Sequence, residues 1–319
     1  MKRPAILGLA LLLLSSAARA RAQETHLVII TGVEGDAEHG DQFHKWAAAV
    51  IDAATTRGGV PESNITYLAD KPERDPMRIK ARSTRDQVTR AFGDLAARAR
   101  PSDQVLIFLF GHGSFDGHQA AFNLPGPDLT APDYADLLAK IRSARIAFVN
   151  TSSSSGEFVK VLAGPGRTII TATRSGGERN EPRFPAFFVE ALTSDAADRN
   201  RDGRISLQEA FEYARSKVQG VFEKEGFIVS EHATLEETQA GSAATLFLAS
   251  DRVRSAGAET ADPALRAALE QKQALEDQVA ALRLRKGSMP AEDYDRELEK
   301  LLTALAQKSR AVQQLEGKK

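Results

Sequence analysis

Residues 105–114 read VLIFLFGHGS, an unbroken apolar run followed by a turn with a histidine between two glycines. A short apolar run that ends at glycine is typical of a strand buried on both faces, as in a parallel sheet. Runs of similar character recur along the chain, and we expect strands at residues 27–31, 146–150 and 167–171, a weaker strand at 65–68 and an edge strand at 245–248.

Amphipathic stretches with helical periodicity separate these runs, at residues 42–56, 84–99, 131–142 and 184–194. Alternation of strands and helices predicts an α/β fold of three layers, with a mostly parallel sheet and right-handed crossovers. Ligands of such sheets bind beyond the carboxyl ends of the strands. Polar residues that directly follow a strand, such as His112 and the serines at 152–155, are therefore candidates for a functional site.

The composition excludes several classes of protein and of functional site. The 319 residues include 42% hydrophobic residues, enough for a packed core in one large domain or two smaller ones. With 42 basic against 43 acidic residues, the formal charge is −1, and nothing favours a nucleic-acid partner. The absence of cysteine excludes disulfides, thiolate metal sites and a cysteine nucleophile.

Residues 1–22 have the pattern of a secretory signal peptide. Lys2 and Arg3 precede a short apolar segment, and small residues suited to signal cleavage follow it. An uncleaved N-terminal anchor is the alternative. No later apolar run is long enough to span a membrane, so we expect an exported protein, either periplasmic or secreted.

The C-terminal part differs in composition from residues 23–252, which we expect to form the main domain. Residues 253–262 resemble a linker, and residues 263–317 are rich in alanine, leucine and charged residues. Two runs with apolar residues at spacings of three and four predict a pair of helices, separated near Pro290. Two interpretations stay open: a hairpin or coiled coil that mediates self-association, or a solvated helical tail that packs on the main domain.

Residues 198–209, DRNRDGRISLQE, match the EF-hand calcium loop. Oxygen ligands fall at the expected spacing, a glycine allows the sharp turn, and a final glutamate suits bidentate coordination. The predicted Ca²⁺ ligands are Asp198, Asn200, Asp202, Arg204 through its carbonyl, Ser206 and Glu209. Neighbouring arginines offset the carboxylates, so we expect a structural or weakly regulatory Ca²⁺ rather than a sensor; an acidic surface loop is the alternative.

The two polar turns resemble motifs of the caspase/legumain clan of cysteine peptidases, particularly its bacterial legumain-like branch. His112-Gly113 matches the motif that carries the catalytic histidine in that clan. Residues 152–156, SSSSG, match the motif of the nucleophile, with Ser153 where the family has cysteine.

The resemblance extends over roughly residues 25–235 and includes residues 171–178 and 184–192. It implies a caspase-like α/β fold with the EF-hand as an insertion. It implies peptide-bond hydrolysis only if serine replaces the thiolate successfully. A serine hydroxyl must lose its proton during attack and normally needs a histidine oriented by a carboxylate.

Three interpretations of this site follow. In the first, the fold binds a peptide or protein without catalysis. In the second, Ser153 is a nucleophile, with His112 as base and the N–H groups of Gly113 and Ser153 as oxyanion donors. In the third, the two turns have a structural role only. Asp116 and Asp133 are nearby in sequence, but neither is a clear third member of a triad.

Arg174 follows the strand at 167–171, where it can line a pocket and pair with an acidic or polar substrate side chain. A surface ion pair is the commoner use of such an arginine.

Overall fold

The computed structural model describes residues 23–143, 145–199, 203–249, 263–284 and 289–316. Its strands are β1 (Thr25–Thr31), β2 (Ile65–Ala69), β3 (Ile79–Arg82), β4 (Gln104–Phe110), β5 (Gly113–Phe115), β6 (Ala120–Phe122), β7 (Leu129–Thr130), β8 (Arg145–Asn150), β9 (Arg167–Thr171) and β10 (Thr234–Glu237). Its α-helices are α1 (Ala37–Asp52), α2 (Arg85–Arg98), α3 (Ala131–Leu138), α4 (Glu157–Leu162), α5 (Phe184–Thr193), α6 (Leu207–Glu225), α8 (Pro263–Leu284) and α9 (Ala291–Glu316).

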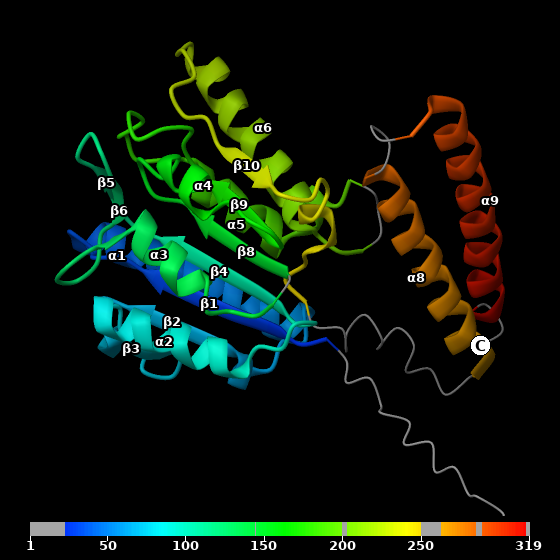
Figure 1. Cartoon of the computed structure of the whole chain (residues 1–319), viewed down its shortest axis with the longest axis horizontal. Coiled ribbons are helices and arrows are strands. Elements are labelled where there is room, and N and C mark those ends of the chain that lie inside the picture. The colour runs from blue at the N-terminus through cyan, green and yellow to red at the C-terminus, as the bar shows by residue number, and fades with distance from the viewer. Residues whose placement is uncertain (1–22, 144, 200–202, 250–262, 285–288, 317–319) are drawn as a thin grey trace, which may run out of the picture.

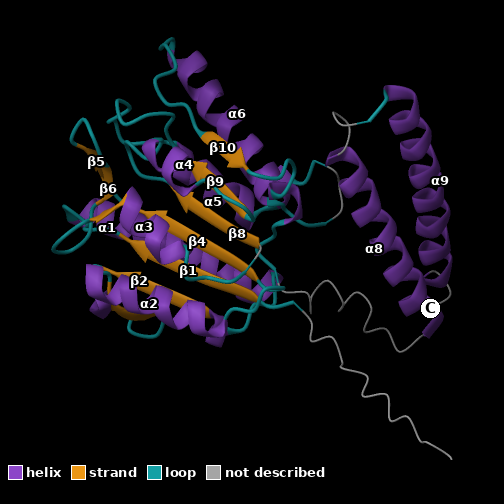
Figure 2. Ribbon diagram, viewed as in Figure 1, coloured by secondary structure: helices purple, strands orange, loops and turns teal. Residues whose placement is uncertain are grey.

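A seven-stranded sheet in the order β10-β9-β8-β4-β1-β2-β3 forms the middle layer. Its strand pairs are parallel, apart from β10, which runs antiparallel to β9 at one edge. Helices α1, α5 and α6 cover one face of the sheet, and α2, α3 and α4 cover the other (Figures 1 and 2). The predicted α/β class, with three layers and a mostly parallel sheet, is confirmed.

The central strands are buried on both faces because their side chains alternate between two cores. In β1, Leu27 and Ile29 join the cluster under α1 and α5, whereas Val28 and Ile30 join the cluster under α2 and α3. Each of these four residues is at most 1% exposed. The unbroken apolar runs of the sequence therefore reflect two covered faces rather than one.

The expectation of an edge strand at residues 245–248 is wrong. This segment begins at Thr245, the last residue of a short 3-10 helix, and makes a single antiparallel bridge, between Phe247 and Ser206. Leu246 and Leu248 are buried in the core beside α6, so their hydrophobic character reflects burial without strand pairing. The edges of the sheet are instead β10 and β3, neither of which has a long apolar run.

Helix α2 begins where the sequence predicts, because the side chain of Thr84 accepts a hydrogen bond from the N–H of Gln87. Helix α6 ends at Gly226, whose φ of 71° is the left-handed conformation that terminates many helices. Helix α4 was not predicted, since its six residues are too few to show a helical period.

The two predicted C-terminal helices are α8 and α9, which contact each other through Leu265, Ala268 and Val312. Residues 1–22 and the whole predicted linker, residues 253–262, lie outside the described residues. Self-association through these helices stays a prediction. In the part of the chain that the structure describes, we find no helix with the length and apolar character of a membrane span.

Candidate functional site

The candidate site lies where the order of strands along the sheet reverses. The chain runs outward from β1 to β2 and β3, and then returns to place β4 on the other side of β1. Such a reversal at the carboxyl ends of the strands is the usual ligand position in these sheets. Here the loops after β1 and β4 stay in contact, since the Gly32 N–H donates to the Phe110 carbonyl at 3.0 Å. His112 follows β4 and Ser153 follows β8, so the sheet brings both predicted residues to this edge.

His112 is held by a backbone carbonyl and two aromatic rings. Its Nε2 lies 3.4 Å from the carbonyl oxygen of Glu34, which can only accept a hydrogen bond. The imidazole packs edge-on against Phe43, at 5.2 Å between ring centroids, and against His39, at 4.8 Å. With Nε2 as the donor, Nδ1 of the neutral ring is the nitrogen available to accept a proton.

The hydroxyl of Ser153 is bonded to the backbone rather than to the histidine. Its Oγ donates to the carbonyl oxygen of Gly113 at 3.0 Å. Both Ser153 and His112 lie within the described residues, and no hydrogen bond links them there. The pair is close enough to share a pocket, but His112 does not take the hydroxyl proton in this arrangement.

The serine turn has a strained backbone. Among the described residues, Ser154 is the one non-glycine residue with positive φ, at 58°. Such a conformation costs about 1–3 kcal/mol and persists when neighbours enforce it. Here the Ser154 N–H donates to the carbonyl of Glu178 at 2.9 Å, and the Asn150 side chain accepts from the N–H and the hydroxyl of Ser152.

Gly113 lets the two turns approach each other. The N–H of Asn123 donates to the His112 carbonyl, so Gly113 and Phe122 form a non-hydrogen-bonded pair between β5 and β6. In such a pair, the backbone N–H and C=O of Gly113 point away from β6. The carbonyl faces Ser153, as its hydrogen bond demonstrates.

We expect Gly113→Ala to lower the free energy of unfolding by about 1–3 kcal/mol, because the new methyl group would overlap the Ser153 carbonyl oxygen and the Ser152 hydroxyl. Urea denaturation measures this change. The matched control is Gly93→Ala in α2, where a Cβ meets no atom within 4 Å and should raise stability by up to about 1 kcal/mol. If Gly113→Ala leaves the free energy of unfolding unchanged, the close approach of the two turns is contradicted.

One pocket is lined by His112 and Ser153, whereas Gly113, the third residue with a predicted catalytic role, is not part of its lining. It is a small, partly enclosed hollow with a volume of about 20 Å³. Aromatic and proline side chains form much of its wall, and the polar groups come from the loops after β4, β8 and β9. The lining residues are Phe43, Trp46, Gly111, His112, Thr151, Ser153, Glu181, Pro182 and Pro185.

Next to this pocket, His39 bridges two carboxylates. Its Nδ1 lies 2.8 Å from Asp36 Oδ2, and its Nε2 lies 3.3 Å from Glu181 Oε2. The hydrogen bond to Asp36, and after it the bond to Glu181, raise the pKa of His39 above its ordinary value against the opposing effect of partial burial. Asp36 also caps α1 by accepting from the His39 N–H.

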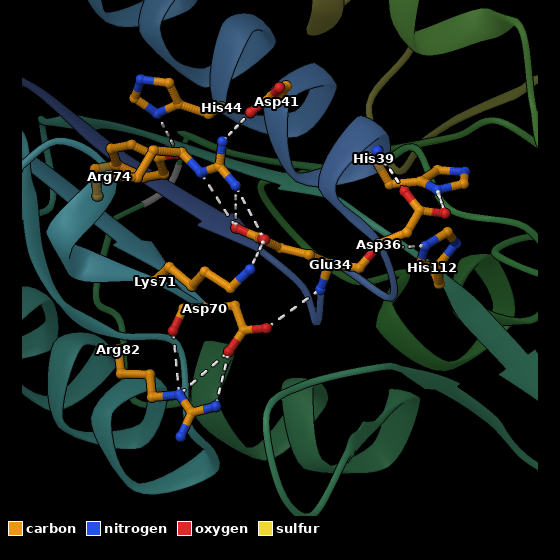
Figure 3. A network of polar contacts seen from close by, with 11 residues as sticks. Glu34, Asp36, His39, Asp41, His44, Asp70, Lys71, Arg74, Arg82 and His112 are labelled. Carbon is orange, nitrogen blue, oxygen red and sulfur yellow. Dashed lines mark hydrogen bonds and ion pairs between the residues drawn. The ribbon is translucent and has the colours of Figure 1, made fainter.

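The loop after β1 is anchored by Glu34, which sequence reasoning missed. The Glu34 carbonyl contacts His112, its N–H donates to Asp70 at 3.3 Å, and its carboxylate is 7% exposed. Figure 3 shows Glu34 with His39 and His112 on one side and Lys71 and Arg74 on the other. Lys71 lies 2.8 Å and Arg74 lies 3.0 Å from the Glu34 carboxylate.

Neither acidic residue considered as a third triad member contacts His112. Asp116 accepts from the N–H groups of His118 and Gln119 in an exposed turn. Asp133 caps α3 and pairs with Arg85. The group that holds His112 is instead a backbone carbonyl, which no side-chain pattern in a sequence reveals.

Arg174 does not line the pocket. Its side chain is 67% exposed and lies 3.8 Å from Glu178, which also contacts His232. Arg174 therefore forms a surface ion pair, which is the commoner role of an arginine at such a position. A role in substrate binding stays a prediction.

The loop predicted to bind calcium lies between α5 and α6, as a helix–loop–helix requires. The Gly203 N–H donates to Asp198 Oδ2 at 2.9 Å, and Gly203 has a φ of 79°. Glu209 Oε2 accepts from the N–H and the hydroxyl of Ser206 and so caps α6. The side chain of Arg204 stacks on Phe247.

Two predicted ligands, Asn200 and Asp202, lie outside the described residues. Within the described ranges, no group of three or more acidic, histidine or cysteine side chains is arranged for a metal ion. The donor set of the complete loop, with carboxylate, amide, hydroxyl and carbonyl oxygens, suits Ca²⁺ chemically. Calcium binding stays a prediction.

Comparison with known proteins yields a structural likeness only. No protein-family model matches the chain, and no curated protein matches it. Caspase-1 from Spodoptera frugiperda is among the solved structures similar to it, with a TM-score of 0.41 and 11% identity. The likeness covers 68% of this chain and 87% of the caspase chain. It concerns the course of the backbone and says nothing about catalysis.

Proposed function

We propose that this is an exported, calcium-binding protein with a caspase/legumain-like fold, whose pocket binds a peptide or protein segment without cleaving it. The observation that carries the proposal is the hydrogen bond from the Ser153 hydroxyl to the Gly113 carbonyl. A serine nucleophile needs a base positioned to take its proton. Here His112 donates to one backbone carbonyl and Ser153 to another.

The pocket supports the binding part of the proposal. A concave site with apolar walls and a few polar groups is the usual form of a ligand site. Phe43, Trp46, Pro182 and Pro185 supply the walls, and the loops after the strands supply the polar groups. The pocket is small, with a volume of about 20 Å³, so it would contact only one small group of a bound segment.

An active serine hydrolase is the second candidate. Ser153 and His112 share the pocket, and the backbone of Gly113 faces the serine turn, where an oxyanion donor would be needed. The two functions differ in the hydrogen bond that the Ser153 hydroxyl makes.

We expect a fluorophosphonate probe to leave Ser153 unlabelled, and a peptide mixture to remain uncleaved, in the presence and absence of millimolar Ca²⁺. The physical reason is the missing serine–histidine hydrogen bond. Intact-mass spectrometry measures both results, with His112→Ala as the control for base-dependent labelling. Labelling of Ser153 that disappears in His112→Ala would replace the proposal with the hydrolase.

For the calcium loop, we expect millimolar Ca²⁺ to raise the melting temperature, because an ion that binds only the folded state stabilises it. Glu209→Gln should remove this effect, since it deletes the bidentate carboxylate but keeps the glutamine that a capping box accepts. Isothermal titration calorimetry checks the binding itself. No heat of binding at millimolar Ca²⁺ would exclude the site.

A further inference from the structure

Residues 245–249, which we call the partner segment, lie directly against the predicted calcium loop. Phe247 forms an antiparallel bridge with Ser206, and the N–H of Leu207 donates to the carbonyl of Leu246 at 2.9 Å. Ser206 is a predicted Ca²⁺ ligand, and Leu207 is the first residue of α6. The end of the loop is therefore paired through its main chain, as it would be beside a neighbouring strand.

This pairing satisfies a backbone group at the start of α6. The N–H groups in the first turn of a helix have no acceptor within the helix. Ser206 and Glu209 satisfy each other in a capping box, and the carbonyl of Leu246 accepts from Leu207. The partner segment therefore helps to fix the first turn of α6, which carries Glu209, the glutamate predicted to bind Ca²⁺ through both oxygens.

A side-chain contact holds a further predicted ligand. The guanidinium carbon of Arg204 lies 4.4 Å from the centre of the Phe247 ring, within the range of a cation–π interaction. The carbonyl of Arg204 is predicted to face the ion, so the position of its backbone affects the site. Phe247 thus contacts the loop twice, at Arg204 through its ring and at Ser206 through its main chain.

The other side of the partner segment is bonded to the central sheet. The side-chain amide of Gln104, the first residue of β4, accepts from the Phe247 N–H at 3.2 Å and donates to the Phe247 carbonyl at 2.6 Å. Gln104 is 3% exposed. The hydroxyl of Thr25 in β1 donates to the carbonyl of Ala249. The calcium loop is therefore paired with a segment that two strands of the sheet hold in place.

We propose that the partner segment positions the ligands of the calcium loop, with Phe247 as the positioning residue, so that docking of this segment and Ca²⁺ binding strengthen each other. This inference rests on the proposed function, because it assumes that the loop binds Ca²⁺. Ligands that are already held in place lose less conformational freedom when the ion binds, so the affinity rises. By thermodynamic linkage, Ca²⁺ then stabilises the docked partner segment by the same factor.

Isothermal titration calorimetry with CaCl₂ on the full chain tests the role of Phe247. We expect Phe247→Ala to bind Ca²⁺ about tenfold more weakly than the unmodified chain, although Phe247 supplies no ligand. The matched control is Phe222→Ala near the other end of α6, where a partly buried phenylalanine also stacks with an arginine, Arg183, at 5.1 Å. It should keep the affinity of the unmodified chain, and circular dichroism checks that both variants are folded.

A second measurement uses the unmodified chain and so does not depend on the folding of a variant. Saturating Ca²⁺ should slow hydrogen exchange of the backbone amides of residues 246–248 by up to about tenfold, because it stabilises the docked segment. The Phe247 amide is the main reporter, since it donates to the Gln104 side chain. The amides of the edge strand β3 are the internal control and should exchange at the same rate with and without Ca²⁺.

The outcomes separate this inference from the proposed function. No heat of binding in the unmodified chain at millimolar Ca²⁺ would overturn the calcium-binding part of the proposed function, and the inference with it. Binding that is equally tight in the unmodified chain and in Phe247→Ala would overturn the inference alone. Equal weakening by Phe247→Ala and Phe222→Ala would also overturn it, because the affinity would then depend on the stability of α6. If Phe247→Ala does not fold, exchange at residues 246–248 that is independent of Ca²⁺ would reject the coupling.

Discussion

Ser153→Cys is expected to yield a thiol whose pKa lies below the usual range of cysteine, and which reacts with iodoacetamide about tenfold faster at neutral pH than an exposed cysteine does. The reason is the shared pocket, in which His112 can stabilise a thiolate. A thiol ionises far more readily than a hydroxyl, so a pair that is inactive with serine can be reactive with sulfur.

The chain contains no cysteine, so this variant has a single thiol and its alkylation can be followed by mass without interference. The rate is measured as a function of pH. His112→Ala in the same background should return the thiol to ordinary reactivity. Ser114→Cys, two residues beyond His112 on an exposed position, is the matched control for accessibility. Equal rates with and without His112 would show that His112 does not activate a nucleophile at position 153.

Glu34→Gln is expected to lower the free energy of unfolding by about 2–3 kcal/mol. The carboxylate is nearly buried and contacts both Lys71 and Arg74. The amide keeps the size of the side chain but loses the charge, so two cations lose their main partner. Urea denaturation measures the change in stability.

Asp41→Asn is the matched control, because Asp41 pairs with the same Arg74 but is 75% exposed. An exposed ion pair contributes at most about 1 kcal/mol. Equal stability losses in the two variants would mean that burial of Glu34 contributes nothing.

Much of the fold was predictable because buried segments consist largely of apolar residues, which can be recognised in the sequence. The strands at 105–110 and 146–150 could be predicted without knowing which segments lie beside them, since strands covered on both faces are apolar at nearly every position. The failed strand at 245–248 shows the limit of this reasoning: hydrophobic residues report burial, not hydrogen-bonding partners.

The candidate site was predictable in part for a related reason. His112 and Ser153 directly follow buried strands, and parallel strands end at one edge of the sheet, so their proximity followed from the order of elements. No buried strand directly precedes Glu34, His39 or Glu181, so the order of elements did not predict their place in the site. Each is a polar residue in a loop or at the start of a helix, and its neighbours there are distant in sequence.

The sequence by itself determined the layered α/β architecture, the positions of the two polar turns at one edge of the sheet and the presence of serine at position 153 in a chain without cysteine. Only the tertiary structure decided which hydrogen bond the Ser153 hydroxyl makes, which carbonyl holds His112 and which charge lies in the pocket. Periodicity encodes how a segment is buried, whereas a hydrogen bond depends on the position of two groups to within a fraction of an ångström. That position is set by the packing of loops such as those of Glu34 and Gly113, which are far apart in the chain.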